Sequence, residues 1–556
     1  MSICHNIADR LRLTAEACPQ QRAVVYPAGR DPAGRVTYSQ LTFAQLNAES
    51  DQLARGLIRQ GVTPQMRIVL MVRPGLEFIA LTFALFKAGA TVVLIDPGMG
   101  RRSIFRCLQQ VAPGGFVAIP LVQMLRRLSR RRFADARLNV TVGRRWFPHE
   151  VTYGDLLRLG ETPGDLPQTR DTDPAAIIFT SGSTGPPKGV LYQHGMFNAQ
   201  VDLLQNHYAI EPGEIDLPGF PLFALFNAAM AVTTVIPDMD PTRPADVDPL
   251  KILQAVRDQG VTQAFGSPAL WNRVGRYCVD HGIRLTSFKR ILSAGAPVPQ
   301  HVLESMSRVL EGTGARVHTP YGATEALPVC SIDSQTVLTS TTEQTRRGAG
   351  TCVGRPFPGI QLKVIEIHPG PLAALDQARE LPDGRIGEII VSGPVVTRQY
   401  YGHPQATLEA KIPDGDQLWH RMGDVGYLDQ DRRLWFCGRK AHIVHTEQGP
   451  LYTVPCEAIF NNHPDVYRSA LVGIGTADRQ RPVIVVEPEP GHFPQRGPAE
   501  ERFRNQLLTL GGDCELTRGI ATVLFHESLP VDTRHNVKIF REKLAPWAER
   551  QLATAG

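Results

Sequence analysis

Short β-branched runs alternate with longer amphipathic stretches along most of this chain. Strands are predicted at residues 67–72 and 91–95, on either side of a helix predicted at residues 76–87. Further strands are predicted at residues 175–180, 262–267, 290–293 and 388–392. This alternation is typical of an α/β fold, in which helices pack against β-sheets.

The most apolar stretch, residues 78–95, is interrupted by Lys87 and Gly89. It therefore predicts a buried helix followed by a strand, and not a membrane-spanning helix. Residues 1–13 lack a basic start followed by an apolar run, so we expect no export signal and a cytoplasmic location. The nine cysteines contain no CxxC pair and no metal-binding spacing, which favours reduced thiols.

A length of 556 residues is too great for one hydrophobic core and predicts a large domain plus a smaller one. We expect an N-terminal domain at residues 1–438 and a C-terminal domain at residues 439–556. The second contains predicted strands at residues 470–473 and 483–487 and a predicted helix at residues 498–510. A net charge of +5, without clustered aromatic and basic residues, argues against nucleic-acid binding.

Residues 120–145 are unusually rich in arginine: Arg126, Arg127, Arg130, Arg131, Arg132, Arg137, Arg144 and Arg145. One interpretation is a solvated helix or an insertion on the surface. The other is a docking site for a partner or for anionic lipid. The sequence leaves both open.

A loop rich in glycine and hydroxyl residues directly follows the strand predicted at residues 175–180. It reads Thr180-Ser181-Gly182-Ser183-Thr184-Gly185-Pro186-Pro187-Lys188-Gly189. Glycines allow successive backbone amides to converge on an anion, hydroxyls add donors, and Lys188 supplies a positive charge for polyphosphate. The loop departs from the Walker A pattern in its glycine spacing and in the glycine that follows the lysine.

This loop resembles the phosphate loop of the adenylate-forming superfamily, which includes acyl-CoA synthetases, luciferases and peptide-synthetase adenylation domains. Other motifs of that superfamily recur in order from about residue 65 to residue 545. The resemblance implies a large N-terminal domain of β-sheets packed with helices and a small mobile C-terminal α/β lid. The lid would rotate about residues 439–441.

The resemblance also implies an ATP site. Gly295, Ala296 and Pro297 would lie against adenine, and Tyr321, followed by Gly322, would stack on it. Thr324 would touch the α-phosphate. The ribose would be bound by Asp424 and Arg439, because a carboxylate offers two acceptors to the two hydroxyls of a diol.

Glu325 and the Thr184 hydroxyl are the implied ligands of Mg²⁺, a hard cation that prefers oxygen. The segment at residues 529–540 resembles the terminal motif with the catalytic lysine, which here is Lys538. Lys538 would bridge the attacking carboxylate and the α-phosphate, two anions that otherwise repel each other. Asn536 and Val537 replace the usual Ser-Gly before that lysine.

Five segments are similar to the β-lactone synthetases of bacterial olefin biosynthesis: residues 94–98, 220–226, 236–244, 321–328 and 451–457. That resemblance implies a 2-alkyl-3-hydroxy fatty acid that is activated by ATP and closes to a cis-β-lactone. A fatty acyl-CoA ligase or a fatty acyl-AMP ligase that loads a carrier protein is the nearest alternative. A non-catalytic assembly subunit is the alternative from another class.

An apolar pocket for the alkyl chains is expected from Phe220, Phe223, Leu225 and Phe226, although ordinary core packing would also explain them. His194 is a candidate acceptor for the 3-hydroxyl proton, but a lone histidine is also commonly structural. The family context implies three partners: a thiolase-like condensing enzyme, a ketoreductase and an α/β-hydrolase-fold lactone decarboxylase.

Overall fold

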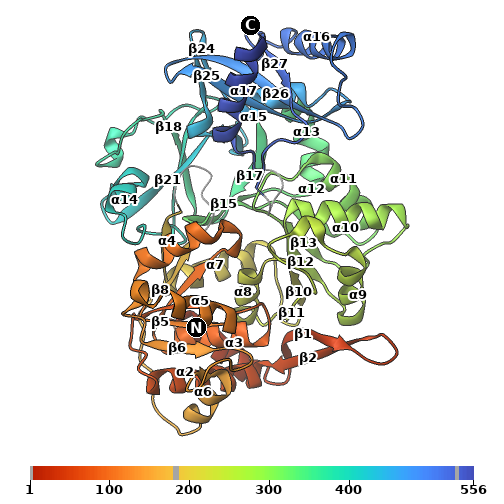
Figure 1. The fold of residues 1–556 in the computed structure, drawn as a ribbon. Helices are drawn as coiled ribbons and strands as arrows, with labels where there is room; N and C mark the ends of the chain where they lie inside the picture. Colours follow the sequence, from red (N-terminus) through yellow and green to blue (C-terminus); the bar gives the residue numbers. More distant parts are fainter. Residues whose placement is uncertain (1–3, 180–186, 533–537, 556) are drawn as a thin grey trace.

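The computed structural model describes residues 4–179, 187–532 and 538–555 (Figure 1). Its first sheet has seven strands, parallel from β7 to β8, with β9 antiparallel at one edge. In spatial order they are β7 (Val151–Thr152), β6 (Leu138–Thr141), β5 (Gly115–Ala118), β3 (Arg67–Met71), β4 (Thr91–Ile95), β8 (Pro174–Phe179) and β9 (Gly189–Gln193).

A second sheet of seven strands is parallel except for the hairpin of β1 and β2. In spatial order it contains β14 (Arg316–His318), β13 (Arg290–Ser293), β12 (Gln263–Gly266), β10 (Ile215–Pro218), β11 (Thr233–Val235), β1 (Arg22–Arg30) and β2 (Val36–Thr42). Parallel strands end at the same edge of a sheet, so the loops that follow β13 and β14 emerge together.

The third sheet is antiparallel and has eight strands. Seven of them follow the order β15 (Tyr321–Ala323), β16 (Ala326–Ser331), β17 (Thr351–Pro356), β22 (Leu434–Arg439), β21 (Gln417–Leu428), β19 (Gly387–Ser392) and β18 (Gln361–Ile365). The eighth, β20 (Lys411–Asp414), pairs with β21. This sheet supplies most of the site described below.

The C-terminal part, blue at the top of Figure 1, has its own sheet of β25 (Val466–Thr476), β26 (Arg479–Pro488) and β27 (Val523–Phe525). The hairpin of β23 (Val444–Thr446) and β24 (Gly449–Leu451) precedes it, and three helices pack around it: α15 (Thr453–Phe460), α16 (Pro498–Gly512) and α17 (Arg541–Ala555). Two hydrophobic clusters contain only residues after Ile443. The boundary predicted at residue 439 stays a prediction that these separate cores favour.

The predicted apolar helix is α3 (Leu76–Lys87), and every residue from Phe78 to Lys87 is buried. The Lys87 ammonium, at its end, contacts Asp51 Oδ1 at 2.7 Å and Ser50 Oγ at 2.8 Å on α2 (Phe43–Arg59). A buried lysine needs such partners to offset the loss of hydration. None of the helices in the described ranges combines the length and apolar character that a membrane span requires.

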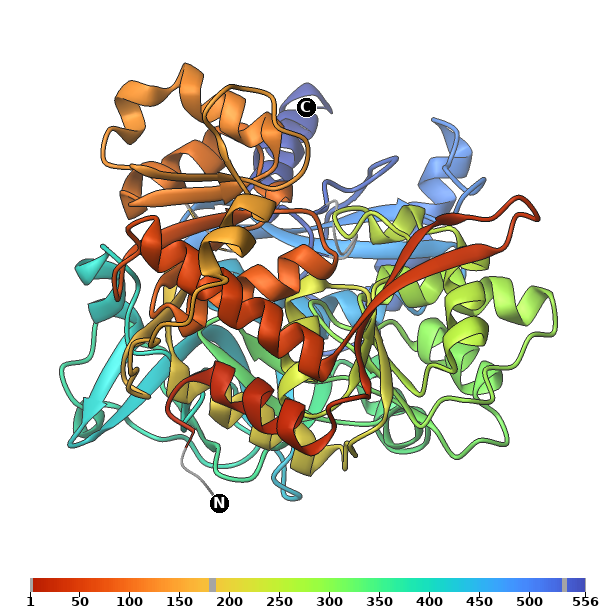
Figure 2. The same cartoon turned by 90° about the horizontal axis from the view of Figure 1, so that it is seen from below.

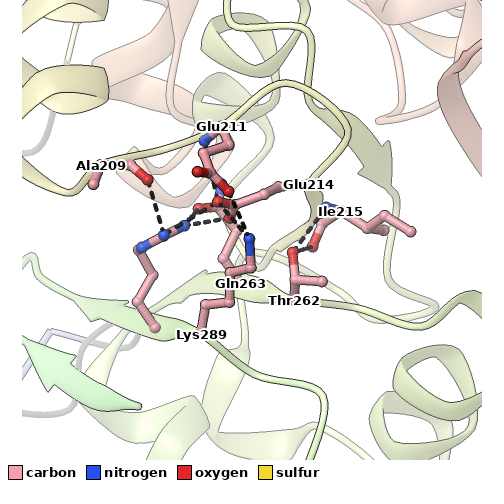
Figure 3. Close-up of polar contacts among 8 residues, drawn as sticks. Ala209, Glu211, Glu214, Ile215, Thr262, Gln263 and Lys289 are labelled. Atoms are coloured by element: carbon pink, nitrogen blue, oxygen red, sulfur yellow. Dashed lines mark hydrogen bonds and ion pairs between the residues drawn. The ribbon is translucent and has the colours of Figure 1, made fainter. Parts of the chain in front are cut away.

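A polar network fastens the ends of β10, β12 and β13 (Figure 3). The Arg290 guanidinium, at the start of β13, bonds Gln263 Oε1 at 2.8 Å and forms a close ion pair with Glu214. Both charged side chains are buried, whereas Lys289 and Glu211 form a 3.1 Å ion pair at the exposed rim of the network. A buried ion pair of this kind fixes strand positions, because separating the two partners would leave each as an uncompensated buried charge.

Candidate active site

Asp424 is the centre of a buried polar cluster on the third sheet. It lies on β21 directly opposite Arg439 on β22, and the Arg439 Nη1 atom is 2.9 Å from Asp424 Oδ1. The Tyr321 hydroxyl, on β15, donates to Asp424 Oδ2 at 2.6 Å. Three of the predicted ATP-site residues therefore meet at one carboxylate, and Tyr321 reaches it from more than a hundred positions earlier in the chain.

One oxygen of Asp424 is left with acceptor capacity. Its Oδ1 atom is buried and receives no hydrogen bond from the described residues, because the contact with Arg439 has ion-pair distance without hydrogen-bonding geometry. Burial raises the pKa of Asp424, and Arg439 opposes this rise. A buried acceptor without a donor is costly, so this atom fits a ligand hydroxyl such as one of a ribose diol.

Glu325 follows β15 and is held by its side chain and by its backbone. The Tyr400 hydroxyl donates to Glu325 Oε1 at 2.7 Å. The Thr397 amide and hydroxyl both donate to the Glu325 carbonyl oxygen, at 2.9 and 3.0 Å. A carboxylate fixed from two sides presents its remaining lone pairs in a defined direction, as an oxygen ligand of a hard cation requires.

Lys188 lies next to Tyr400, the residue that holds the Glu325 carboxylate. Its Nζ atom is 5.1 Å from the centre of the Tyr400 ring, a cation–π contact. The position follows from backbone pairing, because the Tyr401 amide donates to the Gly189 carbonyl at 2.7 Å and Val190 forms a bridge with Tyr400. The end of the phosphate loop thus reaches the segment that connects β19 to β20. Thr180, Ser181, Gly182, Ser183, Thr184 and Gly185 lie outside the described residues.

Lys411 is a buried lysine close to Glu325. Its ammonium contacts the Thr397 hydroxyl at 3.4 Å, and Thr397 in turn bonds the Glu325 carbonyl. Burial lowers the pKa of Lys411 to about 7, and the Glu325 carboxylate opposes this shift. Across the strand pair, Lys411 faces His420, whose pKa burial also lowers. Lys411 therefore reaches Glu325 through Thr397.

The predicted adenine segment forms the turn between β13 and α11 (Gln300–Val309). Gly295 in this turn has φ +93°, a left-handed conformation that glycine adopts without strain. Ala296 is half-buried and Pro297 is exposed. Because β13 and β14 are parallel neighbours, the turn lies at the same sheet edge as residues 319–321, the segment that leads into Tyr321.

A row of aromatic rings joins the predicted apolar pocket to the residue before Glu325. Phe223 contacts Phe226 with ring centres 6.1 Å apart, and Phe226 contacts Phe197 at 6.2 Å. Phe197 stacks on Tyr192 at 4.8 Å, and the Tyr192 hydroxyl donates to the Thr324 carbonyl. Phe220, Phe223, Leu225 and Phe226 are all half-buried. A chain of apolar surface therefore ends at the carbonyl of a predicted phosphate-contacting residue.

His194 lies in the core, one ring removed from the aromatic row, because Phe86 contacts both His194 and Phe197. It is fully buried at the start of α7 (His194–His207), and its Nδ1 atom accepts from the Ile7 amide at 3.4 Å. Its ring packs edge-on against Phe86 at 5.6 Å. Burial lowers its pKa to about 4, so the ring is neutral near pH 7. Its role as proton acceptor stays a prediction, which this packing does not favour.

Lys538 is held in place by Asp532. Its amide donates to Asp532 Oδ1 at 2.9 Å, and its carbonyl accepts from the Asp532 amide at 3.0 Å. The ammonium is close enough to Asp424 to lower the pKa of that carboxyl, against the larger effect of burial. The C-terminal part thus brings a cation to the carboxylate that Tyr321 and Arg439 also reach.

Sequence reasoning missed four residues that shape this site: Tyr192, Thr397, Tyr400 and Lys411. Each acts through a partner distant in the chain, and none lies in a motif with a distinctive spacing. The Arg398-Gln399-Tyr400-Tyr401-Gly402 segment carries no local pattern that indicates pairing with β9.

Comparisons with known proteins agree with this geometry. A family model described as AMP-binding enzyme matches residues 11–401. The olefin beta-lactone synthetase of Xanthomonas campestris pv. campestris is 46% identical over 558 residues, covering 99% of both chains. The olefin beta-lactone synthetase of Stenotrophomonas maltophilia is also 46% identical, and the alignment covers 98% of both chains.

The amide bond synthetase McbA from Marinactinospora thermotolerans has the same fold, with a TM-score of 0.78 at 21% identity. The match covers 97% of this chain and 99% of that one. This likeness confirms the predicted α/β architecture of a large N-terminal and a smaller C-terminal part. Because the family model spans more than half of the chain and the identity to relatives extends over nearly its full length, the chain belongs to the AMP-binding enzyme family.

Proposed function

We propose that this enzyme activates a 2-alkyl-3-hydroxy fatty acid with ATP and closes it to a cis-β-lactone. In the first step a carboxylate oxygen bonds to the α-phosphorus and pyrophosphate leaves. In the second step the 3-hydroxyl oxygen bonds to the acyl carbon, the bond to AMP breaks, and the hydroxyl proton passes to a base. The observation that carries the proposal is the near full-length identity of 46% to two olefin beta-lactone synthetases.

The nucleotide would be bound by the cluster around Asp424. The free acceptor at Asp424 Oδ1 would take a ribose hydroxyl, with Arg439 beside it. Tyr321 and the turn at Gly295, Ala296 and Pro297 would hold adenine between them. A buried site of this kind strengthens each polar contact because water does not compete for the donors.

Glu325 fits the role of a magnesium ligand, because its carboxylate is fixed and Lys188 lies nearby. Mg²⁺ needs few protein ligands when phosphates supply its other oxygens. When bound, Mg²⁺ would offset the charge of the phosphates. Thr184 is the second expected ligand and lies outside the described residues. Tyr400 and Thr397 would keep the Glu325 side chain and backbone in place.

Lys538 would reduce the repulsion between the attacking carboxylate and the α-phosphate. Once the adenylate has formed, attack by the substrate's own hydroxyl is unimolecular, so proximity replaces a second acceptor such as CoA. The half-buried aromatic row would hold the alkyl chains and exclude water from the adenylate. The assembly with condensing, reducing and hydrolase-fold partners and the cytoplasmic location stay predictions.

Mass analysis of the products tests the proposal. The protein is incubated with ATP, Mg²⁺ and a synthetic 2-alkyl-3-hydroxy acid, with and without CoA. We expect β-lactone, AMP and pyrophosphate in equal amounts, with no requirement for CoA. A thioester as the sole product would instead identify an acyl-CoA ligase, and free acyl adenylate that never cyclises would identify an acyl-AMP ligase.

A second control separates chemistry from binding. The same acid without its 3-hydroxyl should still drive pyrophosphate release but should give no lactone. If the deoxy acid is not activated at all, the hydroxyl takes part in substrate recognition and not only in ring closure. Absence of pyrophosphate release with every acid would support the non-catalytic alternative.

A further inference from the structure

Helix α5 (Pro120–Leu128) presents its leucines to solvent. Leu121, Leu125 and Leu128 are 49%, 41% and 78% exposed, and they follow one another at helical spacing on one face. Trp146, in the same arginine-rich segment, is 51% exposed. Large apolar side chains gathered in this way usually mark a surface that something covers.

The helix is fixed in this orientation by a buried glutamine. Gln123 is almost fully buried, and its side-chain amide donates to the Val140 carbonyl at 2.9 Å and to the Phe116 carbonyl at 3.2 Å. Its Oε1 atom accepts from Arg126 Nε at 3.0 Å. Rotation of the helix to bury the leucines would leave these polar groups unpaired, so the apolar face stays outward.

The exposed leucines lie in a segment of the chain that is rich in positive charge. Residues 120–147 contain eight arginines and only one acidic residue, Asp135. Arg127 and Arg145 reach carboxylates of Glu150 and Asp155. Within the part of the chain that the structure describes, no ion pair engages the other exposed members, which are Arg130, Arg131, Arg132, Arg137 and Arg144.

We propose that this face, formed by α5, the arginines of residues 130–144 and Trp146, docks on an anionic lipid bilayer. Arginine heads match anionic headgroups, while leucine and tryptophan side chains enter the boundary between headgroups and acyl chains. In Figure 2 the orange segment that includes α5 projects from one corner of the molecule. A projecting cationic corner with outward leucines fits a flat, deformable bilayer better than a protein partner, which would need a groove to receive it.

Flotation with vesicles tests this docking. The full chain is mixed with vesicles of phosphatidylcholine alone or of phosphatidylcholine with phosphatidylglycerol. We expect flotation only with the anionic vesicles and a loss of binding as salt is added. Arg130→Glu/Arg131→Glu/Arg132→Glu should weaken binding by about 100-fold or more, whereas the matched control Arg273→Glu/Arg276→Glu/Arg308→Glu on another exposed surface should not.

A second pair of variants tests how much the exposed leucines contribute to vesicle binding. Leu125→Ser/Leu128→Ser should weaken binding by about 10-fold, and Leu250→Ser, which removes an equally exposed leucine elsewhere, should have no effect. Trp146 fluorescence should shift to shorter wavelength on anionic vesicles, and this shift should be absent in Trp146→Phe. Unchanged melting temperatures would confirm that each surface variant is folded.

Two results would overturn the proposal. One is the failure of the unmodified protein to float with anionic vesicles, which would leave a protein as the occupant of this face. The other is unchanged flotation of the triple arginine variant with anionic vesicles. Since neither measurement involves turnover, the outcome is independent of the proposed reaction.

Discussion

Asp424 brings together a phenol, a guanidinium and an ammonium from three distant segments, and one of its oxygens still lacks a hydrogen-bond donor. Asp424→Asn removes the charge and one acceptor while keeping the shape. Hydrogen bonds to charged groups contribute about 1.5–3 kcal/mol, so kcat/KM for ATP should fall by about 10–100-fold. Pyrophosphate exchange at varied ATP measures this, with the exposed Asp431→Asn as the control.

Lys411 makes stability depend on pH. Its pKa is about 7 in the folded protein against a usual 10.5, so between these values the unfolded chain holds a proton that the folded chain has released. Stability attributable to Lys411 therefore rises with pH across this window and is lowest below it. Lys411→Met should be more stable than the parent near pH 6, and the difference should narrow as pH approaches about 10.

Urea unfolding at several pH values tests this, with the exposed Lys251→Met as the control that should show no such trend. A difference between Lys411→Met and the parent that stays constant over the whole range would contradict the assignment of a lowered pKa. Because Lys411 contacts Thr397 behind Glu325, we also expect Lys411→Met to lower kcat while retaining ATP affinity.

At the scale of elements, the network in Figure 3 holds β13 against β12 and the loop before β10. Glu214→Gln leaves the buried Arg290 without its counter-charge and should lower the free energy of unfolding by about 3–5 kcal/mol. Glu211→Gln removes only the exposed ion pair with Lys289 and should change the free energy of unfolding by about 1 kcal/mol or less. Equal effects in chemical denaturation would mean that burial of the Arg290 pair does not matter.

The elements themselves were largely predictable. The structure has a helix at Leu76–Lys87 and strands at Thr91–Ile95 and Arg290–Ser293, as the local periodicity indicates. Residues 120–133 form a helix and a short 3-10 turn on the surface, as one interpretation of the arginines expected, whereas residues 138–141 form β6 within the first sheet. The orientation of α5 was not predictable, because it depends on the tertiary hydrogen bonds of Gln123, which bury that polar side chain and leave the leucines exposed.

The site was predictable where a motif is local. Tyr321, Glu325, Asp424 and Arg439 were expected from their segments, and the structure brings them together. Thr397, Tyr400 and Lys411 reach the same place through tertiary contacts of residues 397–411 with β9 and Glu325, which a single sequence does not specify. Family membership and the fold are confirmed by the comparisons, whereas the roles of individual residues stay predictions.

At the scale of the molecule, the proposed reaction would depend on Lys538, which the C-terminal part brings near Asp424. Lys538→Ala should reduce pyrophosphate exchange into ATP by about 100-fold or more, since a charge contact at the reacting groups contributes about 3 kcal/mol. ATP binding, followed by calorimetry, should change little. Lys543→Ala, on the exposed side of α17, is the control, and undiminished exchange in Lys538→Ala would place the reaction elsewhere.

The pairing of β9 with residues 399–401 forms a seam between the first sheet and the segment that connects β19 to β20, and it limits how the chain can be recombined. Neighbouring residues of a strand face opposite sides, so a slip of one position would turn Tyr400 away from both Glu325 and Lys188. Chimeras with relatives should therefore retain activity when both sides of the seam come from one parent. Crossovers between residues 193 and 397 take the two sides of the seam from different parents. Such chimeras should lose activity more often, even where each half folds.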